Sequence, residues 1–131
     1  MNLHAKQTEQ TIAFLANRPE VDAAYLHGSY AKGTMHPNSD VDIALLPAPG
    51  KTLSLRDRLE CASQIEVFFG CPVDIGILST GNLVYVKEVI DHGKELFCRN
   101  RFRTDLFLTT SLSMYSDLQQ QRKEVLHAYS A

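Results

Sequence analysis

The sequence of 131 residues contains no apolar run near the ~18–20 residues that a membrane-spanning helix needs. Its first six residues, MNLHAK, lack the apolar core of a secretory signal peptide. Its three cysteines, Cys61, Cys71 and Cys98, cannot all pair, and no two of them form a C-x-x-C motif. These absences predict a cytoplasmic protein without membrane contact, whose thiols are not joined in disulfides.

Positive charge is not in excess either. There are 13 Lys and Arg residues against 15 Asp and Glu residues, a net charge of -2. General nucleic-acid binders are usually basic, so we expect no direct binding of nucleic acid. We see no internal repeat and no low-complexity tract. Hydrophobic residues make up 44% and charged residues 21%, which is close to the average globular protein. The length then predicts a single domain over residues 1–131.

Hydrophobic periodicity and turn residues predict alternating helices and strands. The order is helix, strand, strand, helix, strand, helix, short strand, helix. Strands are expected at 21–27, 39–46, 73–78 and 95–98, and helices at 3–17, 54–69, 82–92 and 104–129. Ser54 suits a helix N-cap, and Gly70 suits the position just after that helix. We therefore expect an α+β fold with a small mixed β-sheet, helices packed on one face of it, and a long C-terminal helix.

Two aspartates on the second predicted strand carry the strongest chemical signal. Asp40 and Asp42 are one residue apart, so the period of two places both side chains on one face, with Cα atoms ~6.5–7 Å apart. Asp74 lies opposite the apolar face of the third predicted strand. If the two strands pair, three carboxylates converge. Such hard oxygen ligands suit Mg²⁺ or Mn²⁺, and a triad can hold two ions ~3.5–4 Å apart, as in phosphoryl transfer.

A glycine-serine pair ends the first predicted strand. Gly28 permits close approach of a ligand, and its N–H, together with the N–H and hydroxyl of Ser29, can bind phosphate oxygens. A phosphate-binding turn beside metal-binding carboxylates suits a nucleoside triphosphate. Taken singly, an Asp-x-Asp pair is more often solvated surface, and Gly-Ser is more often only a turn. Together at this spacing they are expected by chance in only ~10⁻³ of chains.

These motifs resemble the signature of a known superfamily. The sequence GSYAKG at residues 28–33, followed by SDVDI at 39–43, is similar to the DNA polymerase β-like nucleotidyltransferases. The short chain without an appended domain resembles their minimal nucleotidyltransferase branch, which includes the MntA-type antitoxins paired with HEPN-domain toxins. The resemblance is specific over residues 21–46 and weaker beyond. It implies the polymerase β-like nucleotidyltransferase fold and a Mg²⁺-dependent transfer of AMP from ATP.

The resemblance also assigns roles to the motif residues. Asp40 and Asp42 would bind both metal ions, and Asp74 would complete the metal site and help to activate the attacking hydroxyl. The α-phosphate of ATP would be attacked, and pyrophosphate would leave.

Gly28 and Ser29 would hold the β- and γ-phosphates of ATP. Lys32 stands where family members often have arginine, so it keeps the charge but loses the bidentate fork. These three residues are the expected ATP-binding residues.

The resemblance further implies a partner. In the MntA-like antitoxins the acceptor is a tyrosine of the HEPN RNase toxin, so we expect a hetero-oligomer in which adenylylation silences the toxin. The C-terminal helix, with its ends at 103–131, is a candidate partner interface. Two alternatives stay open: a non-catalytic antitoxin that occludes its toxin through the apolar stripe of residues 108–129, and a nucleotidyltransferase for a small-molecule acceptor.

Two further groups of residues have weaker signals. Arg99, Arg101 and Arg103 alternate along the chain, and we expect a solvated basic edge there, with contact to the triphosphate or to an acidic partner as alternatives. His27 could approach a nucleotide, although a histidine on a strand is more often structural.

Overall fold

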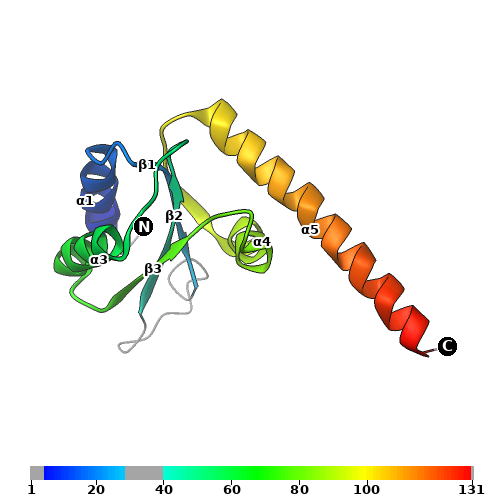
Figure 1. Cartoon of the computed structure of the whole chain (residues 1–131). Coiled ribbons are helices and arrows are strands. Elements are labelled where there is room, and N and C mark those ends of the chain that lie inside the picture. The colour runs from blue at the N-terminus through cyan, green and yellow to red at the C-terminus, as the bar shows by residue number, and fades with distance from the viewer. Residues whose placement is uncertain (1–4, 29–39, 131) are drawn as a thin grey trace.

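The computed structural model describes residues 5–28 and 40–130 of the chain (Figure 1). Within them, four strands form one sheet: β1 (Val21–His27), β2 (Val41–Pro47), β3 (Val73–Ile77) and β4 (Lys94–Cys98). The helices in the described ranges are α1 (Ala5–Ala16), α3 (Leu55–Phe69), α4 (Leu83–His92) and α5 (Arg101–Ser130). The order and type of these elements confirm the prediction from the sequence.

The sheet has the strand order β3-β2-β1-β4. β1 pairs with β2 and with β4 in antiparallel fashion, whereas β2 and β3 are parallel. Parallel neighbours need a crossover connection, which α3 provides. The sheet is therefore mixed, as predicted, and the crossover brings the start of β3 beside the start of β2.

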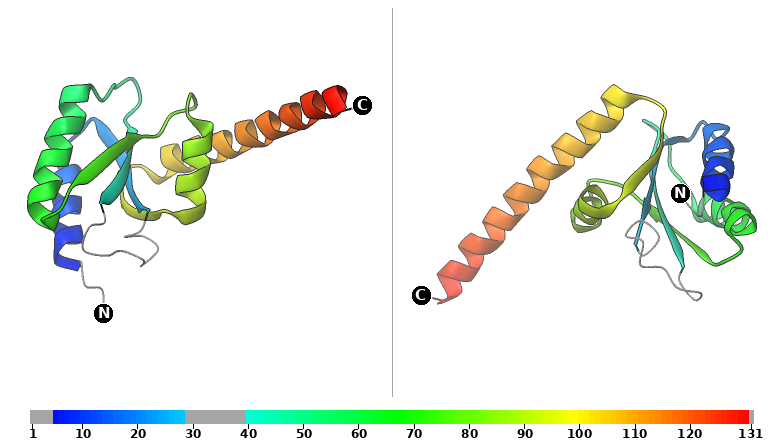
Figure 2. Two further views of the ribbon diagram at one scale, coloured as in Figure 1. Left: turned by 90° about the horizontal axis from the view of Figure 1, so that it is seen from below. Right: turned by 180° about the vertical axis from the view of Figure 1, so that it is seen from behind.

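Helices cover both faces of the sheet, so the expectation of helices on one face was wrong (Figures 1 and 2). α1 and α3 pack on one face, and α4 with the first part of α5 packs on the other. The polar start of β2 suggested an open face. However, Ala44 and Leu46 follow Asp42 on that face and are buried. Only the end of the face is polar, and the rest needs a helix over it.

Two hydrophobic cores result from this arrangement. The core under α1 and α3 is the larger one, and its fully buried residues include Leu15, Val41, Ile43, Leu45 and Ile65. The core under α4 and α5 is smaller. It combines small side chains of the sheet with the helix residues Val86 and Val89, and Phe107 and Leu108 of α5 pack against it.

Local signals explain the helix ends. Ser54 caps α3 in a reciprocal capping box with Asp57, and Gly70 ends it in the left-handed conformation with φ +71°, as predicted. The predicted start of the last helix was three residues late. The side chain of Asn100 accepts a hydrogen bond from the main-chain N–H of Arg103 at 2.9 Å and so acts as its N-cap.

Three arginines hold α5 to the sheet. Arg103 donates two hydrogen bonds to the buried Asp22, at 2.6 and 3.1 Å. Arg101 pairs with Glu95 of β4, and Arg99 donates to main-chain carbonyls at the end of α1 and the start of β1. All three contacts lie at the start of β1 or at β4. The arginines therefore serve as internal anchors, and the structure lends no support to the alternative of a triphosphate contact.

α5 runs on beyond the body of the protein (Figures 1 and 2). Its 30 residues make a helix about 45 Å long, at about 1.5 Å per residue. Its first part packs on α4, whereas every residue from 121 to 130 is exposed. No helix within the described parts of the chain is both long and apolar enough to cross a membrane.

Candidate active site

A row of polar side chains crosses the sheet where β1 ends and where β2 and β3 begin. His27 of β1 is the register partner of Asp42 of β2, and Asp42 is the register partner of Asp74 of β3. Register partners project from the same face of a sheet, and neighbouring strands lie about 4.8 Å apart. The two strands predicted to carry the carboxylates thus pair, and the crossover through α3 places Asp74 beside Asp42. We call His27, Asp42 and Asp74 the carboxylate row.

The charges of this row act on one another. Asp42 is half-buried, whereas Asp40, just before β2, and Asp74 are exposed. Burial raises the pKa of the Asp42 carboxyl above its usual value. The nearby His27 opposes this shift, and the negative charges of Asp74 and Asp40 add to it. Carboxylates that crowd in this way favour a cation between them.

Gly28 places the main chain directly against Asp42. Its φ is +73°, a conformation that glycine adopts at little cost, and a Cβ at this position would collide with the Asp42 carboxylate. Another residue here would be strained and would push the Asp42 carboxylate aside, so glycine is the residue that fits. Ser29 and Lys32, which complete the predicted phosphate-binding segment, lie outside the described residues.

The donor set fits a hard divalent cation. The three carboxylates supply the oxygen ligands that Mg²⁺ prefers. Within residues 5–28 and 40–130, no three His, Cys, Asp or Glu side chains stand close enough together to hold an ion. Asp40 and Asp74 are exposed, so rotating them toward Asp42 would disturb little packing. The strand register places Asp42 beside Asp74, and the three carboxylates are not gathered around one point.

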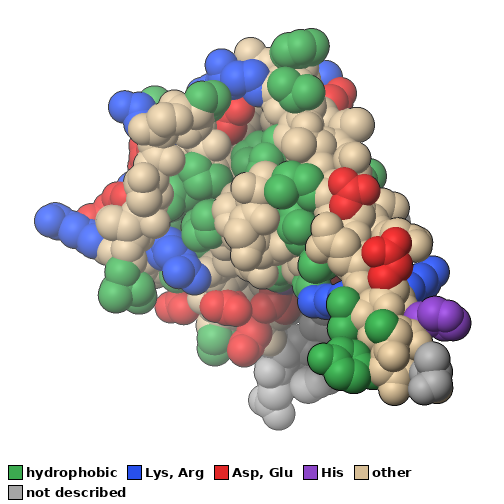
Figure 3. Space-filling view, turned by 45° about the vertical axis from the view of Figure 1, so that its right-hand side comes forward, with side chains coloured by type: hydrophobic (Ala, Val, Ile, Leu, Met, Phe, Trp, Pro, Cys, Tyr) green, Lys and Arg blue, Asp and Glu red, His purple; other side chains and the backbone are tan. Residues whose placement is uncertain are grey.

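Figure 3 shows acidic side chains gathered at the lower end of the molecule, where β1 ends and β2 and β3 begin. The carboxylate row belongs to this acidic end. A surface of this kind repels a bare triphosphate and attracts divalent cations. Bound cations would therefore favour the approach of a nucleotide to this end of the sheet.

A tyrosine that was not predicted as a site residue lies beside the carboxylate row on the same face of the sheet. The hydroxyl of Tyr85, from α4, is 2.9 Å from Nε2 of His27. Burial, followed by the charges of Asp74 and Asp42, raises the pKa of this hydroxyl. The ring covers Gly76, where a Cβ would collide with it. A glycine on the carboxylate face of a strand signals such a close approach, and this was the available clue.

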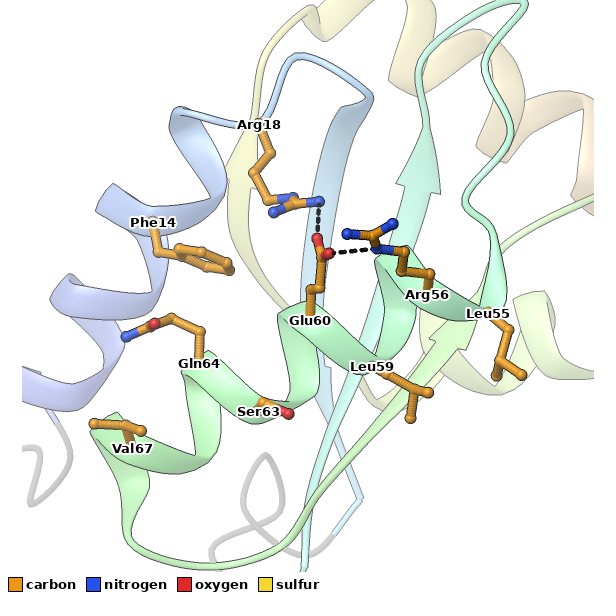
Figure 4. A pocket seen from close by; sticks show the side chains of 9 residues that line it. All are labelled: Phe14, Arg18, Leu55, Arg56, Leu59, Glu60, Ser63, Gln64 and Val67. Carbon is orange, nitrogen blue, oxygen red and sulfur yellow. Dashed lines mark hydrogen bonds and ion pairs between the residues drawn. The ribbon is translucent and has the colours of Figure 1, made fainter.

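A groove of the surface lies away from this site. The groove between α1 and α3 has a volume of about 810 Å³ and is lined by Phe14, Arg18 and the outer face of α3 (Figure 4). Glu60 of α3 accepts a hydrogen bond from Arg18, which follows α1, and another from Arg56 one turn earlier on α3. α1 and α3 cover the sheet face opposite to the carboxylate row, so this groove is no part of the candidate active site.

Comparisons with known proteins agree with this geometry. A family model described as "Polymerase beta, Nucleotidyltransferase" matches residues 9–102. Among curated proteins, the protein adenylyltransferase MntA of Shewanella oneidensis is 36% identical over 110 residues, which cover 84% of this chain and 77% of that protein.

Solved structures are similar over nearly the whole chain. One is a toxin–antitoxin crystal structure with AMP-PNP, with a TM-score of 0.73, 34% identity, and coverage of 94% of this chain and 98% of that one. Another is the tri-AMPylated HEPN toxin of Shewanella oneidensis in complex with MNT antitoxin. It has a TM-score of 0.71, 28% identity, and coverage of 95% and 97%.

The family match includes all four strands and the carboxylate row, and it ends where α5 begins. The mixed sheet, and the position of Asp42 and Asp74 on adjacent strands, agree with what was expected from the sequence. This protein belongs to the polymerase β nucleotidyltransferase family.

Proposed function

We propose that this protein transfers AMP from ATP to a tyrosine hydroxyl of a HEPN-domain RNase toxin and thereby neutralises it. One observation carries the proposal: Asp42 and Asp74 lie opposite each other on adjacent parallel strands, with Gly28 against Asp42. The similar proteins named above include a protein adenylyltransferase and an AMPylated toxin bound to its antitoxin. They support the same reaction and the same kind of partner.

In this proposal Asp40, Asp42 and Asp74 are the metal ligands and the catalytic residues. Two Mg²⁺ ions, or Mn²⁺ in their place, would neutralise charge on the phosphate oxygens when bound. The acceptor oxygen forms a bond to the α-phosphorus, the bond from that phosphorus to the bridging oxygen breaks, and pyrophosphate leaves. Asp74 would take the proton of the hydroxyl, and its exposed position on the edge strand supports this role.

The same proposal assigns ATP binding to the turn after β1. Main-chain N–H groups of Gly28 and Ser29 would donate to the β- and γ-phosphates, because the absence of a Cβ at Gly28 lets the phosphates approach. Lys32 would act as a point charge on the same phosphates. We place the protein and its toxin in the cytoplasm, where ATP and RNA are available, and no disulfide joins its cysteines.

The test uses the full chain with the product of the neighbouring gene. With ATP labelled at the α-phosphate and Mg²⁺, we expect label on that partner. Asp40→Asn combined with Asp42→Asn should remove the labelling while the complex still forms. Asp91→Asn, a change of an exposed carboxylate on α4, is the matched control and should label normally. A stable complex that never carries label would contradict the proposal.

A non-catalytic antitoxin is the second candidate, and α5 favours it. Val125, Leu126 and Tyr129 are 55%, 69% and 87% exposed on the part of the helix that leaves the body. Figure 3 shows apolar side chains near that end. We propose the C-terminal helix, 103–131, as the partner interface in either case. If the double aspartate variant protects cells from the toxin as well as the wild type does, occlusion is sufficient.

A further inference from the structure

A tyrosine-histidine pair lies at the carboxylate row. Tyr85 reaches from α4 across β3 to His27, and the two rings meet edge to face, with centroids 5.4 Å apart. His27 is in turn the register partner of Asp42. Tyr85 is therefore separated from a proposed metal ligand by a single side chain.

The sheet is shaped to receive this tyrosine. Two residues further along β2 and β3, Ala44 and Gly76 are register partners on the same face. Gly76 has no side chain, which leaves room for the ring of Tyr85. On α4, Val86 and Val89 are almost fully buried and fix the helix against the sheet. Tyr85 precedes Val86 on this helix, so the position of its hydroxyl is set by how α4 packs on the sheet.

We propose that Tyr85 is a positioning residue for the nucleotidyl transfer, acting through His27 on the carboxylate of Asp42. Asp42 has Gly28 on one side and His27 on another, so its orientation depends on where the imidazole stands. The hydrogen bond between Tyr85 and Nε2 of His27 restricts how the imidazole can turn, so its loss changes where the ring stands beside Asp42. Groups that orient metal ligands in this way typically change metal affinity or activity by about 10- to 100-fold when removed.

The competing explanation is that Tyr85 only fills the small core, and the chain contains a matched control for it. Tyr25 belongs to the same core, and its hydroxyl donates a hydrogen bond to Glu95 at 3.2 Å. Burial raises the pKa of both hydroxyls. Tyr25 contacts the β4 side of the sheet, however, and not the carboxylate row. Tyr25→Phe and Tyr85→Phe each remove one hydroxyl from this side of the sheet. Only Tyr85→Phe removes the hydrogen bond to His27.

This inference rests on the proposed function, and the experiment separates the two. Binding of Mg²⁺ with the non-hydrolysable AMP-PNP is measured by calorimetry on the full chain, which requires no turnover. We expect Tyr85→Phe to weaken this binding about tenfold and Tyr25→Phe to change it less than about twofold. In the metal-free protein, the imidazole NMR signals of His27 should shift in Tyr85→Phe and not in Tyr25→Phe. Urea unfolding should show both variants folded.

A variant of His27 tests whether Tyr85 acts through this histidine. In a His27→Gln background, adding Tyr85→Phe should weaken binding less than about twofold further, because the two residues act as one unit. His27→Gln alone also provides the test if Tyr85→Phe does not fold. Equal binding by Tyr85→Phe and Tyr25→Phe, with unchanged His27 signals, would overturn the inference. If no partner is labelled but binding still depends on Tyr85, the proposed acceptor is wrong and the role of Tyr85 stands.

Discussion

The two faces of β2 differ in what they contribute. Toward α1 and α3, the strand presents Val41, Ile43 and Leu45, which are all completely buried in the larger core. Toward α4, it presents Asp42 and then two apolar residues. A strand with period two can therefore build a stable core with one half of its side chains and a reactive site with the other half.

The difference teaches that stability and chemistry are separable within this small sheet. The larger core holds the strands in register, and that register alone brings Asp42 beside Asp74. The opposite face is apolar in the part that α4 and α5 cover. Outside that part, its side chains are polar. Substitutions of adjacent residues on β2 should therefore have opposite consequences.

The largest expected effect is on activity. Asp42→Asn removes a proposed ligand of both metal ions, and we expect AMP transfer to fall by about 10³-fold or more, since several kcal/mol of transition-state stabilisation depend on those ions. The unfolding free energy should change little. Transfer to the toxin is measured with labelled ATP, and stability by urea unfolding.

Ile43→Ala, one residue further along the same strand, should show the reverse. A fully buried isoleucine loses contacts on all sides, so we expect a loss of about 3 kcal/mol of unfolding free energy. The remaining folded protein should still transfer AMP. If Asp42→Asn destabilises the protein as strongly as Ile43→Ala, the two faces are not separable.

Much of this arrangement could be predicted from the sequence, for physical reasons. The strand at Val21–His27 and the helix ending at Gly70 follow from local periodicity and capping, and both were placed correctly. Helices on both faces were not predicted, because the face of β2 that begins with Asp42 appears polar in the sequence. Its burial under α4 depends on contacts between distant segments, which periodicity does not encode.

The candidate site shows the same limit. The apolar faces of the two strands predicted that Asp42 and Asp74 would converge if the strands pair, and the parallel pairing of β2 and β3 agrees with this. The predicted strand included Asp40, whereas β2 begins at Val41. Tyr85 could not be placed, since it lies in an apolar helix stripe and reaches His27 only in three dimensions. In the sequence, the glycine at position 76 was the one sign of this contact.

A smaller effect is expected where α5 is anchored to the sheet. Asp22 is only 1% exposed, and Arg103 is its partner. Arg103→Met should lower the melting temperature, because it leaves a buried carboxylate without its cation. The loss should be smaller than that of Ile43→Ala, since the Arg103 side chain is 41% exposed and water can enter where it is removed. Adding Asp22→Asn should restore part of the loss, and the absence of any recovery would show that packing rather than charge is responsible.

A still smaller effect depends on pH. The hydrogen bond from Arg101 lowers the pKa of Glu95 below its ordinary value of 4.5, and burial opposes this only in part. The folded protein therefore holds the Glu95 proton less tightly than the unfolded chain. The stabilisation is present above about pH 4.5 and is lost as the pH falls through the folded-state value.

Glu95→Gln tests this sign. The variant should be slightly less stable than the wild type at pH 7, and the difference should shrink as the pH falls below about 4.5 and through the folded-state pKa of Glu95. Urea unfolding across this range measures it. A difference that grows on acidification would contradict the assignment of the shift to Arg101. This edge of the sheet would then contribute to stability only through packing.

The smallest effect on stability is expected at the far end of α5, and it extends the comparison beyond the sheet. Residues 121–130 are all exposed, so a chain that ends at Gln120 should keep its unfolding free energy to within about 0.5 kcal/mol. Binding to the toxin should nevertheless weaken, because the exposed apolar side chains of this segment are the proposed contact. Val125→Ser with Leu126→Ser should weaken binding in the same way, measured by calorimetry. Gln120→Ser with His127→Ser, on the other side of the helix, should not. Equal binding by both double variants would place the toxin elsewhere on the molecule. The exposed end of α5 would then contribute neither to stability nor to binding of the toxin.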